Sequence, residues 1–281
     1  MKAQDVDDDN QDFLKAFNKG YNEWFHTSLI SPELRNHIES YEITMEQFDR
    51  ITRNRQFQRY IALIDGRVRF SELPKAPHGE IIGDLVHIIS NQLTGPNGLP
   101  LLIMVSDNGI HSWRNFLIGA VDVPCDNRTL KRPDASFKIR RANVPTPPPA
   151  WLKFQGNGQP YPNLVVEVAV NNESPTRLLD NMQRYFRRGT SVRVWIGVKY
   201  WAASRKFWCG WAERRLGGVG GRLHTQMHWP PDHHDITVAT NIVYSIPMVT
   251  VFGPNIPIPP ALPPILTIDS DAIRGTILGE V

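Results

Sequence analysis

The sequence predicts an α/β fold, and three features of the chain indicate it. Residues 79–94 carry a wide apolar face at helical spacing, with polar side chains on the opposite side. Residues 164–170 form an apolar, strand-like run interrupted only by Glu167. Asp65 and Gly66 separate two extended runs, and Asp-Gly is a strong hairpin signal. Helices and strands therefore both contribute to the expected core.

The remaining elements follow in chain order. Apolar periodicity predicts a helix over 13–27, and further helices follow Pro32, which suits a first turn, and Thr44, which is a good N-cap. The segments 142–162 and 253–264 are proline-rich and predict loops or extended surface chain. The other expected strands cover 60–64, 68–70, 99–105, 116–123, 192–198, 207–212 and 265–268, and the other expected helices cover 176–188 and a short stretch capped by Ser270.

Composition suggests four segments. We expect a disordered acidic tail over 1–12, a helical extension over 13–54, a core over 55–215 and a C-terminal extension over 216–281 that packs on the core. Residues 1–12 hold one lysine and five aspartates, a net charge of −4, so the remaining residues carry +7. Such a tail either screens a polyanion-binding surface or keeps the chain soluble.

The overall composition is that of an ordinary globular protein, with 41% apolar and 21% charged residues among 281. Cys125 and Cys209 cannot build a disulfide framework, and neither the cysteines nor the histidines have a zinc-binding spacing. No stretch approaches the roughly 18 apolar residues of a membrane span, and no secretory signal opens the chain. We expect an intracellular protein, cytoplasmic or nuclear, that is neither secreted nor bound to a membrane.

Two carboxylates lie in apolar, strand-like surroundings. Asp134 follows Pro133 ahead of an apolar run, and Glu167 lies within residues 164–170. Holding a charge against a sheet core costs several kcal/mol unless it has a partner. The pair therefore predicts a metal site, and oxygen ligands suit Mg²⁺ or Mn²⁺. The alternative is that Asp134 caps a turn and Glu167 lies on an exposed strand edge.

The order of these motifs resembles the Uma2-like restriction endonucleases of the PD-(D/E)XK nuclease superfamily. The resemblance begins at the Asp65-Gly66 hairpin and continues with Pro77-His78-Gly79-Glu80, which precedes an apolar helix. The two strands that carry Asp134 and Glu167 come next. The last two motifs are Tyr185-Phe-Arg-Arg-Gly189 and Val192-Arg-Val-Trp195-Ile-Gly-Val. It covers about residues 55–200. It implies a restriction-endonuclease-like mixed sheet flanked by helices, with a Mg²⁺-dependent phosphodiester site.

The resemblance also implies roles for individual residues. Asp134 and Glu167 would bind the metal, with the Val168 carbonyl as a third ligand. Glu80, on the first core helix, matches the glutamate that approaches the metal in related nucleases and would position its hydration shell. The alternative for Glu80 is a place on a solvated helix face.

The chain departs from the family at the lysine. The superfamily has this lysine two residues after the second carboxylate, which is Ala169 here, and Uma2-like proteins often have it four residues before the tyrosine, which is Asn181 here. The lysine orients the attacking water and stabilises developing phosphorane charge. Either Gln183 or Arg184 replaces it, or the site is inactive.

Basic residues near these motifs are the expected nucleic-acid contacts. They are Arg184, Arg187 and Arg188 on the helix over 176–188, with Lys131 and Arg132 before Asp134. Arginines on one helix face can straddle a phosphate backbone, although a solvated face gives the same pattern. The expected partner is DNA, with RNA as the alternative, and self-association into a homodimer is left open.

The sequence thus supports two main functional hypotheses. The first is a metal-dependent nuclease that hydrolyses DNA phosphodiester bonds through a two-carboxylate Mg²⁺ site. The second is a catalytically lapsed nuclease-fold module that binds nucleic acid or a protein partner. A structural interaction module is a third class, which the proline-rich segments and the amphipathic helix over 13–27 favour.

Overall fold

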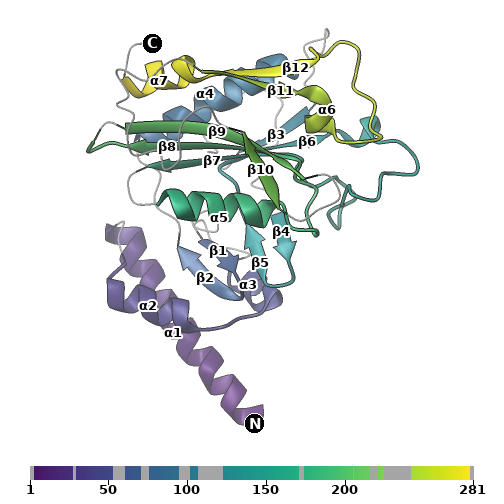
Figure 1. Ribbon diagram of the computed structural model, residues 1–281. Helices are drawn as coiled ribbons and strands as arrows, with labels where there is room; N and C mark the ends of the chain where they lie inside the picture. The colour runs from purple at the N-terminus through teal and green to yellow at the C-terminus, as the bar shows by residue number, and fades with distance from the viewer. Residues whose placement is uncertain are drawn as a thin grey trace. The chain divides into compact units, whose positions relative to one another are not determined.

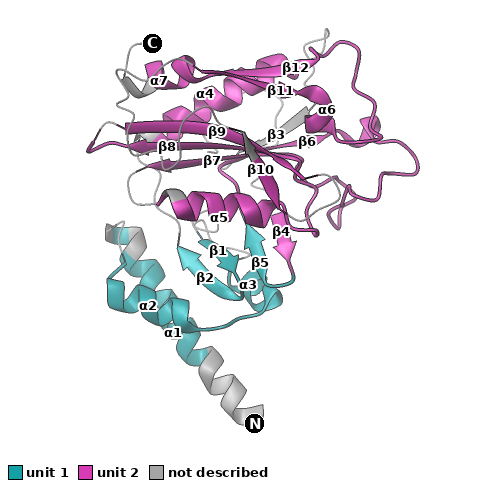
Figure 2. Ribbon diagram, viewed as in Figure 1, with its two compact units in different colours: residues 1–73, 127–131 teal, residues 74–126, 132–281 magenta. Residues whose placement is uncertain are grey.

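The chain falls into two compact units, which are described separately. The computed structural model describes residues 3–27, 30–52, 61–70, 76–94, 102–106, 123–170, 174–204, 206–215, 220–224 and 242–278. Unit 1 comprises residues 1–73 with 127–131, and unit 2 comprises residues 74–126 with 132–281 (Figure 2). The boundary lies beyond the predicted residue 54, because the hairpin over 61–70 shares its apolar cluster with the N-terminal helices.

The described residues of unit 1 form helices and short strands. They are α1 (Ala3–Thr27), α2 (Pro32–Ser40), α3 (Met45–Thr52), β1 (Ile61–Ile64), β2 (Arg67–Phe70) and β5 (Thr129–Lys131). The tail expected to be disordered over 1–12 overlaps α1, whose backbone is helical from Ala3.

The predicted hairpin of unit 1 is confirmed. β1 and β2 pair antiparallel from Ile61 with Phe70 to Ile64 with Arg67. Asp65 and Gly66 both have positive φ, at 52° and 80°, as a tight two-residue hairpin turn requires. The predicted Thr44 cap is confirmed as well, because Gln47 N–H donates to Thr44 Oγ1 at 3.1 Å.

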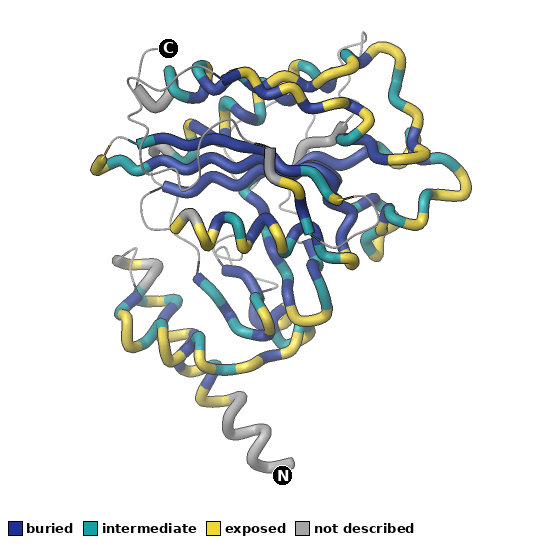
Figure 3. Tube along the Cα trace, in the orientation of Figure 1, coloured by how far each residue is buried: buried dark blue, intermediate teal, exposed yellow. Residues whose placement is uncertain are grey.

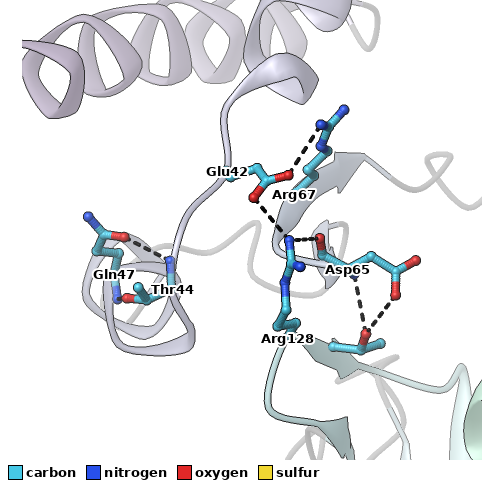
Figure 4. Close-up of polar contacts among 7 residues, drawn as sticks. Glu42, Thr44, Gln47, Asp65, Arg67 and Arg128 are labelled. Carbon is cyan, nitrogen blue, oxygen red and sulfur yellow. Dashed lines mark hydrogen bonds and ion pairs between the residues drawn. The ribbon is translucent and has the colours of Figure 1, made fainter.

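A polar network ties residues 127–131 to this hairpin (Figure 4). Glu42 accepts hydrogen bonds from Arg67 at 3.3 Å and from Arg128 at 3.0 Å. Arg128 also donates to the Asp65 carbonyl at 2.9 Å, and its own carbonyl accepts from Gly66 N–H at 2.7 Å. Exposed ion pairs of this kind stabilise a protein only slightly, so the backbone bonds contribute most of the specificity.

The described residues of unit 2 form a six-stranded mixed sheet in the order β10-β9-β8-β7-β6-β3. β7 and β8 are parallel, and every other neighbouring pair is antiparallel. The strands are β3 (Leu102–Ser106), β6 (Ala135–Ile139), β7 (Leu164–Val170), β8 (Val194–Trp201), β9 (Lys206–Arg214) and β10 (Gly221–His224). The predicted α/β fold, a mixed sheet flanked by helices, is confirmed.

Helices cover both faces of this sheet (Figure 1). On one face lie α4 (Ala76–Gln92) and α7 (Ser270–Leu278) with the two-stranded ribbon of β11 (Val243–Pro247) and β12 (Ile265–Asp269). On the other face lies α5 (Pro175–Tyr185). β7 is buried along its whole length, which is typical of a strand with both faces covered (Figure 3). Unit 2 also contains β4 (Val123–Asp126), the short helix Arg141–Asn143 and α6 (Met248–Phe252).

Most predicted elements of unit 2 have counterparts. The predicted helices over 79–94 and 176–188 are α4 and α5, and the predicted strands over 192–198 and 207–212 are β8 and β9. The predicted strand over 116–123 lies outside the described residues except for Val123. Within the described residues, no helix is both long and apolar enough to cross a bilayer.

Candidate functional site

The register of β6 and β7 brings the two predicted carboxylates together. Ala135 pairs with Val166 in this antiparallel ladder. Because paired positions move in opposite directions along the two strands, the next position places Asp134 beside Glu167. The two residues are thirty-three positions apart in sequence, and the strand pairing alone makes them neighbours.

Asp134 is held by a backbone amide and by a histidine. Its Oδ2 accepts a hydrogen bond from Val168 N–H at 2.7 Å. Its Oδ1 lies 3.4 Å from Nε2 of His78, on the first turn of α4. The side chain of Asp134 is 24% exposed and that of His78 is 14% exposed. One carboxylate oxygen is thus fixed to the β7 backbone, and the other faces an ionisable partner at the border of the core.

The environment of His78 favours its charged form. Burial lowers the pKa of His78, but the Asp134 carboxylate, a backbone hydrogen bond to Val168 and the Glu167 carboxylate together raise that pKa above its usual 6.5. Nδ1 of His78 is buried without a hydrogen-bond partner within the described part of the chain. The pKa of His78 therefore depends on both carboxylates.

Glu167 is held by a phenol. Its residue is 6% exposed, and its Oε1 accepts a hydrogen bond from the Tyr185 hydroxyl at 2.5 Å. Burial and the neighbouring Glu167 charge raise the pKa of Tyr185 well above its usual 10. Tyr185 therefore remains a protonated donor throughout the physiological range. The hydrogen bond orients Glu167 without cancelling its charge.

The ends of α5 are fixed in ways that position Tyr185. Ser174 caps the helix by accepting from Arg177 N–H at 3.2 Å, and Pro175 occupies the first turn. At the other end, Arg214 of β9 donates to the carbonyls of Tyr185 and Phe186. Arg214 also donates to the carbonyls of Arg187, Thr190 and Val192. Burial lowers the pKa of this guanidinium to about 10, so it still carries its charge.

Residues 45–200 match the family described as "Uma2: Putative restriction endonuclease". This match spans more than half of the 281 residues. The chain belongs to the Uma2 family. The match includes both carboxylate strands, α4, α5 and the hairpin of unit 1, which the resemblance placed within about 55–200.

Among solved structures, this Uma2 chain is similar to the crystal structure of "a putative nuclease belonging to DUF820 from Anabaena variabilis ATCC 29413". The two chains share 14% identity and align with a TM-score of 0.40 over 66% of this chain and 86% of that chain. No curated protein matches the chain.

The two positions where Uma2-like proteins carry the lysine are both buried. Ala169 lies on β7 and is 2% exposed, and Asn181 lies one helical turn before Tyr185 and is 5% exposed. Gln183 is exposed, and its Oε1 accepts a hydrogen bond from Gly221 N–H at 3.0 Å. Arg184 is half-buried. Gln183 is therefore engaged with β10, whereas Asn181 lies on the same helix face as Tyr185.

Glu80 is exposed on α4, and within the described residues no contact joins it to Asp134 or Glu167. His78, two residues earlier, makes the contact instead. The sequence favoured Glu80 because it matches the glutamate of the first core helix in related nucleases, and His78 lies beside it in the segment Pro77-His78-Gly79-Glu80.

The basic residues predicted to bind nucleic acid have different environments. Arg187 forms an ion pair with Asp126 at the end of β4. Arg188 is exposed, and Arg132 is half-buried. Lys131 is buried within unit 1. Arg188 is therefore the best placed of these to reach a phosphate backbone.

Proposed function

We propose that this Uma2 protein is a metal-dependent nuclease that hydrolyses DNA phosphodiester bonds at Asp134 and Glu167. The observation that carries the proposal is the β6–β7 register, which makes the two carboxylates neighbours. Their electrostatic influence on both His78 and Tyr185 supports a common site. Two carboxylates that share a small, mostly buried region repel each other, and a divalent cation relieves that repulsion.

The donor set fits a hard cation. Asp134, Glu167 and the Val168 carbonyl supply only oxygen atoms, which suit Mg²⁺ or Mn²⁺. Within the described residues, no three His, Cys, Asp or Glu side chains are arranged to hold an ion. Because Mg²⁺ keeps several waters, this proposal needs no protein ligands beyond the two carboxylates and the carbonyl.

The chain's own residues have distinct tasks in this proposal. When bound, such an ion lowers the pKa of a water and stabilises charge on a phosphate group. Val168 N–H fixes one oxygen of Asp134. Tyr185 donates to Oε1 of Glu167 and so orients this carboxylate. His78 balances the two negative charges from the Asp134 side. Arg184 and Arg188 would contact the nucleic-acid backbone, and DNA is favoured over RNA as the substrate.

A second candidate function follows from one observation. Neither Ala169 nor Asn181 is the lysine that Uma2-like nucleases carry at these positions. A site without any positive group to stabilise phosphorane charge would bind without cleaving. The chain would then be a nuclease-fold module that binds nucleic acid or a protein partner, as a monomer or a homodimer.

The test combines cleavage with metal binding. Plasmid DNA is incubated with wild type and with Glu167→Gln in Mg²⁺ and in Mn²⁺, and Mn²⁺ binding is measured by calorimetry for wild type and Asp134→Ala. We expect cleavage by wild type, no cleavage above buffer by Glu167→Gln, and loss of Mn²⁺ binding in Asp134→Ala. The isosteric amide keeps the packing of the buried site, so the comparison isolates charge.

The matched control is Asp180→Asn, which neutralises an exposed carboxylate on α5. It should cleave and bind Mn²⁺ as wild type does. Equal cleavage by wild type and Glu167→Gln would show that Glu167 does not belong to a catalytic site. Mn²⁺ binding without any cleavage would favour the lapsed binding module.

A further inference from the structure

The residue that lies beside Ala169 on the neighbouring strand is a lysine. β7 and β8 run parallel in a register that pairs Glu167 with Gly197 and Ala169 with Lys199. Lys199 is therefore one strand away from the position where the family motif places its lysine. It lies outside that motif, within the strand-like run that follows α5, and nothing in its local sequence marks it as functional.

Strand geometry places Lys199 on the same face of the sheet as Glu167. Residues two apart on a strand share a face, and paired residues of parallel strands do as well. Tyr185 of α5 contacts Glu167, so this is the face that α5 covers. Glu167, Ala169 and Lys199 thus all face the same layer between the sheet and α5.

The length of a lysine side chain matches the distance to be bridged. Adjacent strands lie about 4.8 Å apart. An extended lysine side chain spans about 6 Å from Cα to Nζ, given single bonds near 1.5 Å. Ala169, which occupies the motif position, carries only a methyl group and is paired with Lys199. The ammonium of Lys199 can therefore occupy the space that a lysine at position 169 would have used.

The burial of Lys199 is itself informative. Lys199 is 0% exposed and is among the largest fully buried side chains of the described residues. Its Nζ lies 5.2 Å from the ring centroid of Trp201, and Trp208 is its cross-strand neighbour on β9. Removing an ammonium from water is costly unless it is partnered, and the Trp201 ring supplies one partner of this side chain.

We propose that Lys199 supplies the positive charge of the two-carboxylate site in place of the lysine missing at Ala169 and Asn181. This role rests on the nuclease function proposed above. Lys199 rests against Trp201 and turns about its flexible stem toward Ala169 when a phosphate group is bound. There the ammonium stabilises the charge that develops on the phosphate as a water attacks.

The first readout is cleavage. Lys199→Met removes the charge and nearly preserves the volume, and turnover should fall by about 10²–10³-fold. The exchange variant Ala169→Lys with Lys199→Ala returns the charge to the motif position and should recover cleavage. Lys206→Met is the matched control, because Lys206 pairs with Trp201 farther along the same face, and it should cleave as wild type does.

The second readout does not depend on catalysis. Like charges repel, so an ammonium beside the carboxylates opposes a bound cation, and Lys199→Met should bind Mn²⁺ about tenfold more tightly in calorimetry. Lys199→Arg and the exchange variant keep the charge and should bind Mn²⁺ as wild type does. A lysine with a purely structural role would instead weaken Mn²⁺ binding or leave it unchanged when removed. Urea midpoints confirm that each variant is folded.

The outcomes separate this inference from the proposed function. If wild type cleaves, Glu167→Gln does not, and Lys199→Met cleaves as wild type does, the role of Lys199 is overturned while the nuclease stands. If wild type does not cleave, the nuclease function fails and the catalytic role of Lys199 fails with it, whereas tighter Mn²⁺ binding by Lys199→Met would still support a place for its charge beside the two carboxylates. Unchanged or weaker Mn²⁺ binding, or no Mn²⁺ binding by wild type, overturns it.

Discussion

Asp134 and Glu167 are neighbours on paired strands, but the two sides of the candidate site hold them by different means. On the α4 side, Asp134 is partly exposed and its partner is His78, which changes charge near neutral pH. On the α5 side, Glu167 is buried and its partner is the neutral hydroxyl of Tyr185. The α4 side can respond to an approaching cation or proton, whereas the α5 side keeps one oxygen of Glu167 in a fixed direction.

This difference indicates a division of labour. A buried hydrogen bond to a charged acceptor is stronger than one between neutral groups and is costly to leave unmade. The α5 side therefore contributes rigidity as well as a ligand. An ion pair at a partly exposed border is weaker and easier to open. The comparison predicts that substitutions on the α5 side lower the free energy of unfolding most. Substitutions on the α4 side should mainly change how the free energy of unfolding depends on pH.

The largest expected effect comes from Arg214→Met. Arg214 donates to carbonyls at the C-terminal end of α5, including those of Tyr185 and Thr190. The variant removes all of these charge-assisted bonds, and although Tyr185, Phe186 and Arg187 keep other donors, it should lower the free energy of unfolding by about 3 kcal/mol. Urea unfolding measures the change. Arg215→Met, at the exposed neighbouring position, is the control and should stay within about 0.5 kcal/mol of wild type. Equal effects of the two would mean that α5 does not depend on this guanidinium.

The next effect is expected from Tyr185→Phe. The variant removes one hydroxyl from a fully buried ring and leaves Glu167 without its donor. We expect a loss of about 2 kcal/mol, the usual range for a hydrogen bond to a charged group. Tyr200→Phe is the control, because Tyr200 is also a mostly buried ring and its hydroxyl makes no hydrogen bond within the described residues. A loss in Tyr185→Phe no larger than in the control would show that Glu167 is satisfied without the phenol.

Local patterns were sufficient to predict much of this fold. The Asp65-Gly66 turn, the apolar face of α4 and the apolar run of β7 are each determined by neighbouring residues, so each could be predicted from sequence. A common site for Asp134 and Glu167 was predicted from their apolar surroundings, without the register that makes them neighbours. That register depends on the contacts of Ala135 with Val166, which no local pattern encodes.

Partners that are distant in sequence could not be predicted in this way. Lys199 becomes a neighbour of Ala169 only through the parallel register of β7 and β8, across the whole of α5. Arg214 caps α5 from β9, and no sequence signal marks an arginine on a strand as a helix cap. Tyr185 belonged to the motif that carried the resemblance, but its contact with Glu167 requires the packing of α5 on the sheet.

A smaller effect is expected from Gln183→Ala. Gln183 accepts a hydrogen bond from Gly221 N–H, so its loss should lower stability by about 1 kcal/mol. Turnover should fall less than in Lys199→Met, because the amide is directed at β10 rather than at the carboxylates. Plasmid cleavage is measured for both variants. The comparison tests whether Gln183, predicted from the motif, or Lys199, indicated by the sheet register, replaces the missing lysine. If turnover falls as far in Gln183→Ala as in Lys199→Met, Gln183 is the better candidate to replace the missing lysine.

The smallest expected effect is the pH dependence on the α4 side. The pKa of His78 is raised above 6.5 in the folded protein, because Asp134 and Glu167 outweigh the effect of burial. The stabilisation from protonated His78 is therefore fully present below that unfolded value and is lost as the pH rises through the raised folded pKa. Wild type should lose free energy of unfolding relative to His78→Gln across this window, as urea unfolding at successive pH values would show. His87→Gln, at an exposed position on α4, should show no such trend. A difference between wild type and His78→Gln that stays constant with pH would mean that His78 is not charged beside Asp134, and the α4 side would then be as fixed as the α5 side.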